Sequence, residues 1–395
     1  MTQRWITILT LIVIVAAAGG CAGTYWGGSA TVQGSTSDDY AYADAGADYI
    51  YDALAPYGAW AEVEPYGWVW CPLDVSPGWR PYTVGYWTYT DWGWMWMADD
   101  PWGPLPYHYG RWAFDVSIGW LWVPGDVWAP AWVAWRYGDG WVGWAPLPPD
   151  ETWRMGVGFA YSSSEFDDRI DRYSWCFVPT RDFTSARISG RLAPPSRNIT
   201  LISVTQDVTT YAVMDGRPAE RGLRPEMLER DLGRPIPKYR VEETRSPRAG
   251  RGVTRRGQTI EVFRPPVEPA SNSDDRLRVP PPERVRTRPT REMVERQARE
   301  RPRFEDRMRE ERAQLARAHE QELQDPPKGV SRDELRRRHE AEMRAQDERE
   351  RRGREALQKR SERVRQWMEQ RRARGQEEEK SQERRRGRNR SPESN

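Results

Sequence analysis

Tryptophan residues at regular intervals are the side chains best suited to bind a ligand. Trp79, Trp102 and Trp128 occupy equivalent positions in three segments, each between an aspartate and a proline. Indole faces exposed at such intervals would form a platform on which sugar rings or peptides could stack. The alternative is that the 22 tryptophans form the core, because burying one indole contributes roughly 4–6 kcal/mol before entropy is counted. We expect the Trp-x-Trp pairs to be buried and these three tryptophans to be exposed.

The first cysteine indicates lipid attachment. Arg4, an apolar run from Ile6 to Ala18 and two glycines precede Cys21, which is the pattern of a secretory signal peptide over residues 1–20. The run is shorter than the ~20 residues of a membrane-spanning helix. Ala18-Gly19-Gly20-Cys21 resembles a bacterial lipobox, whose cysteine is diacylated, although an ordinary secretory signal with an incidental cysteine is the alternative. If the resemblance holds, Ala22 implies the outer membrane, with the protein facing the periplasm.

The other cysteines and the histidines offer little for catalysis. Cys71 and Cys176 could form a disulfide in an oxidising periplasm, or could be two buried thiols. Of the three histidines, only His108 lies outside the Arg/Glu-rich tail. Motifs for acyl transfer, phosphate binding, zinc or redox chemistry do not occur in a supporting context. We therefore expect no enzymatic activity, no cofactor and no metal.

A repeat over residues 56–153 must position the tryptophans. Gly67-Trp68-Val69-Trp70 recurs as Gly93-Trp94-Met95-Trp96 and Gly119-Trp120-Leu121-Trp122, with a degenerate copy at Gly143-Trp144. Residues at spacing two share one face of a strand, so each unit predicts a β-hairpin. Because a lone hairpin is only marginally stable, the four should lie side by side. The predicted fold is mainly β: an antiparallel sheet that is curled, closed into a barrel or split into a sandwich.

The flanking segments predict less regular structure. Residues 21–55 have the composition of a flexible tether, and residues 246–290 that of a disordered linker. Residues 154–245 predict a small α+β module. Within it, Asn198–Val204 alternates as a strand, Asp215-Gly216 marks a turn, and Pro225–Leu232 precedes Gly233 as a short helix. A final strand is expected at Tyr239–Val241.

The last third of the chain predicts a charged helical region over residues 291–375 and a disordered tail over residues 376–395. Ser331-Arg332-Asp333-Glu334 resembles a capping box that restarts the helix after a Pro-Pro-Lys-Gly break. Ala318–Leu323 is weakly duplicated by Arg338–Met343. The apolar stripe of the charged region is sparse for a coiled coil, and consists of Phe304, Met308, Leu315, Leu323, Leu335 and Met343. A solvated single helix, docking weakly on a protein partner, is therefore favoured. Arginines interleaved with glutamates in an exported chain argue against nucleic acid.

The Trp-rich motifs resemble a known group. Tyr66–Trp70, Trp92–Trp96, Tyr109–Trp112 and Gly143–Pro149 are similar to the Trp-rich, YXWGXW-like repeat proteins of the bacterial envelope, which include secreted proteins and lipoproteins. The likeness covers roughly residues 57–240, and the group has no established activity. We expect a non-enzymatic envelope lipoprotein that acts as a scaffold or interaction protein. The alternative is a module that binds glycan or peptidoglycan through exposed repeat tryptophans.

Overall fold

The computed structural model describes residues 46–73, 75–76, 78–115, 119–154, 158–159, 169–244, 253–265, 280–282, 285, 291–326 and 329–388. The expected signal peptide, Cys21 and most of the expected tether lie outside these residues. None of the helices in the described ranges combines the length and hydropathy needed to cross a membrane.

Four β-hairpins occupy the Trp-rich region, as the repeat predicts. In each, two strands that follow one another in the sequence pair antiparallel, and the second strand carries the Trp-x-Trp pair in the first three. Their strands are β1 (Gly58–Val63) and β2 (Gly67–Pro72), β3 (Gly85–Thr90) and β4 (Gly93–Ala98), β5 (Arg111–Asp115) and β6 (Gly119–Val123), and β7 (Val133–Gly138) and β8 (Trp141–Pro146).

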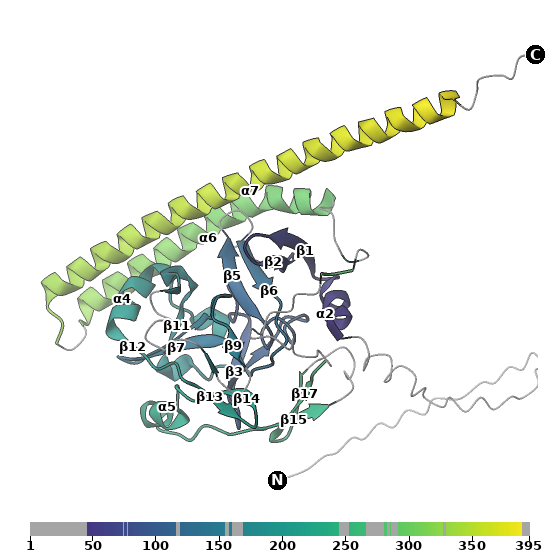
Figure 1. The fold of residues 1–395 in the computed structure, drawn as a ribbon. Coiled ribbons are helices and arrows are strands. Elements are labelled where there is room, and N and C mark those ends of the chain that lie inside the picture. Colours follow the sequence, from purple (N-terminus) through teal and green to yellow (C-terminus); the bar gives the residue numbers. More distant parts are fainter. Residues whose placement is uncertain are drawn as a thin grey trace, which may run out of the picture.

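The hairpins lie in separate sheets instead of forming one continuous sheet. The first and third share a four-stranded sheet in the order β1-β2-β6-β5, in which Trp70 lies opposite Trp122. The second forms a two-stranded sheet of its own. The fourth is flanked by β11 (Cys176–Pro179) and β12 (Gln206–Asp207). The described strands therefore do not close into one barrel (Figure 1). Tryptophans from all four hairpins belong to one buried cluster.

The backbone conformation explains why glycine precedes tryptophan in the repeated Gly-Trp motif. The first residues of β2, β4 and β6, which are Gly67, Gly93 and Gly119, have φ angles of 75°, 100° and 93°, a region that disfavours residues with a Cβ. At Gly93 a Cβ would also lie 2.3 Å from the carbonyl oxygen of Glu220. Glycine is therefore required by the positive φ angle at these three positions and, at Gly93, also by the close approach of another segment.

Indole N–H groups connect the hairpins to distant backbone. Trp70 donates to the carbonyl of Leu54 at 3.1 Å, and Trp94 donates to that of Leu223 at 2.8 Å. Four further buried indoles donate to carbonyls in the connectors, namely Trp112 to Pro106, Trp122 to Tyr109, Trp132 to His108 and Trp144 to Tyr82. These bonds satisfy buried donors and fix how each connector runs over the core.

One predicted element in the region after the hairpins is wrong. Asn198–Val204 is the helix α4, not a strand. The Asn198 side chain is fully buried, and its amide donates to the carbonyls of Arg172 and Trp175, both at 2.7 Å. These tertiary bonds select the helix over a strand that the alternating side chains would also permit.

Other predictions for this region are confirmed. The helix α5 (Pro225–Leu232) ends at Gly233, which has the left-handed conformation. Asp215 and Gly216 form the turn between β13 (Tyr211–Met214) and β14 (Arg217–Glu220). Smaller elements are β9 (Trp153–Arg154), β10 (Gly158–Phe159), η2 (Arg172–Ser174), η3 (Thr180–Asp182), η4 (Ile188–Arg191) and η5 (Pro195–Arg197).

Two segments expected to be unstructured contain ordered elements. The end of the predicted tether is the helix α2 (Gly46–Leu54), which buries Ile50, Tyr51 and Leu54 in the core. The predicted linker contains β16 (Val253–Arg256) and β17 (Thr259–Phe263). The strand β17 pairs with both β16 and β15 (Arg240–Thr244), the latter matching the final strand predicted near Tyr239. The other residues of 246–290 lie mostly outside the described ranges.

The charged region folds as two helices, α6 (Arg291–Gln324) and α7 (Arg332–Arg388). They pack against each other in opposite directions along one side of the β-rich body, so the expected single solvated helix is wrong (Figure 1). Met308, Leu315 and Leu335 of the predicted stripe are buried. The capping interaction is present, since Ser331 Oγ accepts a hydrogen bond from the Glu334 N–H at 3.2 Å. Through Arg388, α7 continues into the tail expected to be disordered.

Replacing Trp102 by alanine should destabilise the body strongly. The Trp102 ring lies 5.1 Å from Trp70 and 5.4 Å from Tyr107 between ring centroids, so its removal leaves a large cavity. We expect the free energy of unfolding, measured with urea, to fall by about 3–5 kcal/mol. Trp68→Ala, at a half-buried position of β2, is the control and should cost less. Equal losses in the two variants would contradict a structural role specific to Trp102.

Candidate functional site

The three tryptophans predicted to face solvent are buried instead. Trp79, Trp102 and Trp128 expose only 7%, 5% and 5% of their surface. The prediction that they form an exposed stacking platform is therefore wrong. The connectors fold back over the hairpins, so their indoles complete the core that the Trp-x-Trp pairs begin.

Aromatic contacts explain this burial. Trp79 packs edge-on against Trp102 and Trp112, with ring centroids 5.8 Å and 5.5 Å apart. Trp128 lies between two other groups: the His108 ring stacks on it at 5.6 Å, and the guanidinium of Arg264 lies 4.0 Å from its ring centroid. Such contacts add to the free energy of area burial.

The structure describes three further residues that the sequence singled out, namely Cys71, Cys176 and His108. Cys71 and Cys176 are thiols, not a disulfide, and burial raises the pKa of the Cys176 thiol. Burial lowers the pKa of His108 to about 4, so this imidazole is neutral at ordinary pH. Within the described ranges, no three His, Cys, Asp or Glu side chains are arranged to hold a metal ion. Cys21 lies outside those ranges.

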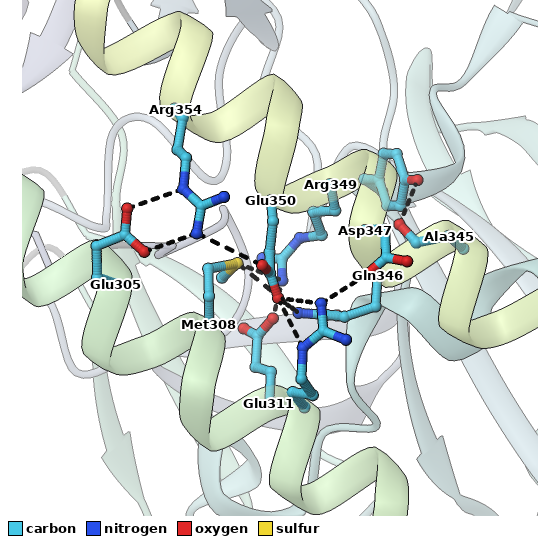
Figure 2. Close-up of polar contacts among 11 residues, drawn as sticks. Glu305, Met308, Glu311, Ala345, Gln346, Asp347, Arg349, Glu350 and Arg354 are labelled. Atoms are coloured by element: carbon cyan, nitrogen blue, oxygen red, sulfur yellow. Dashed lines mark hydrogen bonds and ion pairs between the residues drawn. The ribbon is translucent and has the colours of Figure 1, made fainter.

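Ion pairs join the two long helices, and we call α6 and α7 together the helical hairpin. Figure 2 shows Arg354 of α7 holding Glu305 of α6 through two hydrogen bonds, both 2.9 Å. Farther along, Arg312 of α6 bonds to Asp347 at 2.6 Å and to Glu350 at 2.8 Å. These pairs fix the antiparallel register of the helices, because each joins positions at one level of the pair.

A second set of charges lies between the helical hairpin and the body. Glu311 accepts hydrogen bonds from Arg307, at 3.0 Å, and from Arg349. Arg80, which precedes β3, donates to the carbonyls of Tyr173 and Trp175. Burial and the neighbouring charges of Arg80 and Arg307 lower the pKa of the Arg349 guanidinium. Glu311 therefore pairs with one arginine from each long helix near the buried Arg80 of the body, where an uncompensated charge would be costly.

A reciprocal His–Glu arrangement closes the other end of the interface. The ring of His319 in α6 stacks on that of His339 in α7, with centroids 3.8 Å apart. His319 Nε2 lies 2.8 Å from Glu342 across the helices, and His339 Nε2 lies 2.8 Å from Glu322. Each imidazole Nε2 is hydrogen-bonded to a carboxyl oxygen of the other helix, so the two helices exchange equivalent bonds.

Arg197 attaches this arrangement to the body. Its guanidinium lies 2.5 Å from Glu322 and 3.6 Å from Glu342. Burial opposes ionisation of Glu322, but the Arg197 charge and the hydrogen bonds from His339 and Arg197 outweigh it and lower the pKa of that carboxyl. We call Arg197, His319, Glu322, His339 and Glu342 the clasp.

The clasp borders a hollow of 690 Å³ between the helical hairpin and the body. Its walls come from the β7–β8 turn and α4 on the body, and from the end of α6, the start of α7 and the segment between them on the helical hairpin. The lining residues are Asp139, Trp141, Arg197, Thr200, Leu201, Val204, Glu322, Val330, Leu335, Arg338 and Glu342. The volume lies within the range of about 300–1,000 Å³ that is typical of ligand sites.

The sequence contained a signal for the clasp. The duplication of Ala318–Leu323 in Arg338–Met343 places a His-x-x-Glu pair on each helix. Residues three apart lie on one face of a helix, so two antiparallel copies can bond reciprocally. The participation of Arg197 and the hollow beside it had no local signal, because they depend on how distant segments pack.

Another buried carboxyl group lies on the body. Glu220, at the end of β14, is 2% exposed, and its Oε1 accepts hydrogen bonds from the N–H groups of Gly222 at 2.6 Å and Leu223 at 3.1 Å. Burial raises the pKa of Glu220 to about 8 despite these bonds. The group therefore retains a proton in the folded protein over a pH range in which the unfolded chain has lost it.

Residues 51–151 match a family of unknown function, DUF6600. The match covers the four hairpins, so the Trp-rich, strand-rich region fits an uncharacterised family as the motifs indicate. None of the curated proteins or solved structures is similar to the chain.

Replacing Arg197 by glutamine should loosen the helical hairpin without unfolding the body. Glu342 is 1% exposed, and removing one partner of a buried ion pair costs about 3 kcal/mol. We expect faster amide hydrogen exchange in α6 and α7, with exchange in β1–β8 unchanged.

Arg312→Gln is the matched control, because Arg312 contacts only the helical hairpin through Asp347 and Glu350. In Arg312→Gln, amide exchange near His319 and His339 should remain closer to the parent rate than it does in Arg197→Gln. Unchanged protection of α6 and α7 in Arg197→Gln would show that the clasp does not hold the helices on the body.

Glu220 should make stability fall as pH rises. Its pKa is higher in the folded protein than in the unfolded chain, so its contribution is complete below about pH 4.5 and is lost as pH rises through about 8. The slope reaches at most about 1.4 kcal/mol per pH unit. Glu220→Gln should remove this loss in urea unfolding at pH 5, 7 and 9. The exposed Glu226→Gln is the control, and parallel profiles for all three proteins would contradict the assignment.

Proposed function

We propose that this protein is a non-enzymatic lipoprotein of the bacterial cell envelope. In this proposal a lipid on Cys21 attaches it to the outer membrane, and the folded chain acts in the periplasm as a scaffold or interaction protein. The support for the location is the signal-like sequence from Arg4 to Cys21. We also propose that its uncharacterised family is the Trp-rich, YXWGXW-like group of envelope proteins.

The observation that carries the scaffold role is the unequal length of the paired helices. Arg354 lies beside Glu305, and α6 begins at Arg291. Since both helices rise equally per residue, α7 extends past the start of α6 from about residue 368. Its last segment therefore projects from the body as an arm that reaches Arg388 (Figure 1).

The composition of this arm suits contact with other molecules. Its sequence after Met368 is rich in arginine and glutamate and poor in apolar residues. Such a segment stays soluble without burying a face of its own and can form ion pairs with a protein partner. The tryptophans, by contrast, are mostly committed to holding the body together.

Removing the proposed lipid site tests this function at its first step. Cys21→Ala should abolish incorporation of radiolabelled palmitate and release the protein from the outer-membrane fraction, because acyl burial contributes about 0.8 kcal/mol per methylene. Cys71→Ala, which alters a thiol of the folded body, is the control and should be labelled like the parent protein.

Two results would reject the proposal. One is palmitate labelling that persists in Cys21→Ala. The other is recovery of the parent protein in the cytosolic fraction, where a periplasmic scaffold could not act.

A further inference from the structure

We propose that the hollow beside the clasp is a binding site for a neutral carbohydrate, whose ring would lie against Trp141. This inference goes beyond the scaffold role, because it assigns a ligand class to a site on the body. It also differs from the platform expected at Trp79, Trp102 and Trp128, which the structure buries.

Trp141 gives the hollow an aromatic wall. It is the first residue of β8, directly after the Asp139-Gly140 turn, and its side chain is only half-buried while most indoles of the hairpins are enclosed. Val204 of α4 and Val330, which precedes α7, add half-buried apolar surface to the same hollow. The Arg197 guanidinium lies 5.7 Å from the centroid of the Trp141 ring, so a ligand would share the indole with this group. An indole beside aliphatic groups suits the C–H-bearing face of a sugar ring, which is flat and weakly apolar.

Polar groups around this wall offer both donors and acceptors. Carboxylates of Asp139, Glu322 and Glu342 line the hollow together with the guanidiniums of Arg197 and Arg338. Thr200 adds a hydroxyl, which can donate or accept. A ligand with several hydroxyl groups can use both kinds of partner at once, as ring hydroxyls of a carbohydrate do.

The charge balance favours a neutral ligand over an ionic one. Arg197 already bonds to Glu322, and Arg338 bonds to Glu334 at 2.7 Å. A strongly anionic ligand would compete with these carboxylates for the two guanidiniums, and a cationic ligand would compete with the guanidiniums for the carboxylates. Breaking the partly buried Arg197–Glu322 pair is costly, although the more exposed Arg338–Glu334 pair contributes less. A neutral polyol can instead accept and donate at the remaining lone pairs and N–H groups.

The hollow also depends on the docked helices. Glu322, Val330, Leu335, Arg338 and Glu342 belong to the helical hairpin or to its connecting segment, whereas Trp141 and Thr200 belong to the body. A bound ring would touch both parts, so it should favour the docked state by mass action. The clasp therefore lies at a position where ligand binding and helix docking can be coupled.

Saturation-transfer NMR with N,N′,N″-triacetylchitotriose, a neutral oligosaccharide, tests this site on the purified full chain in detergent. We expect transfer to the sugar ring protons and a tenfold or greater loss of affinity in Trp141→Ala. Trp68→Ala is the matched control, because Trp68 is also half-buried and directly follows a hairpin turn but does not line the hollow. Its affinity should equal that of the parent protein.

A second variant keeps the test decisive if Trp141→Ala does not fold. Thr200→Phe fills the hollow from α4 and should abolish transfer while the circular dichroism spectrum is retained. No transfer to the parent protein, equal loss in Trp141→Ala and Trp68→Ala, or full binding by Thr200→Phe would each overturn the proposal. Palmitate labelling at Cys21 is independent of these outcomes, so failure here is distinguishable from failure of the proposed location.

Discussion

Burial of indole rings in a small β-rich body is the constraint on which the other features depend. Four short hairpins supply few aliphatic side chains, so tryptophans must provide most of the apolar area that offsets chain entropy. The buried indoles of Trp70, Trp94 and Trp144 also donate their N–H to a backbone carbonyl outside their own hairpin. The connectors therefore cannot lie loosely on the surface. They are drawn over the core and contribute their own aromatic rings to it.

The helical hairpin is attached by a different kind of interaction. Its contact with the body relies on polar groups, with Tyr173 donating to the carbonyl of Ala345 at 3.0 Å in one place and Arg197 between two glutamates in another. Such pairs add little stability relative to apolar packing, but they tolerate few alternative arrangements. They thus set where the helices dock, and the position of the docked helices in turn creates the hollow beside Trp141 and leaves the end of α7 projecting from the body (Figure 1).

Periodicity predicted the parts of this structure that are local. The Trp-x-Trp spacing and the Gly-Trp motif predicted all four hairpins, and Pro225 with Gly233 predicted α5. The alternation of Ile260 and Val262 with polar residues was masked by the Pro- and Arg-rich composition around it, so β17 was missed. Asn198–Val204 was misassigned because hydrogen bonds from Asn198 to distant carbonyls decide its conformation. Whether Trp102 faces solvent depends on the path of its connector, about which a repeat carries no information.

Hydrogen exchange of the indole N–H of Trp79, followed by NMR on ¹⁵N-tryptophan-labelled protein, tests the burial of the connector tryptophans most directly. Its signal can be assigned by its absence from a Trp79→Phe variant. The Trp79 side chain is 7% exposed and its Nε1 is buried, which predicts exchange slower by orders of magnitude than in an unfolded chain, because opening requires disruption of the aromatic core. Exchange at the rate of an unprotected indole under native conditions would contradict a core built from the connectors.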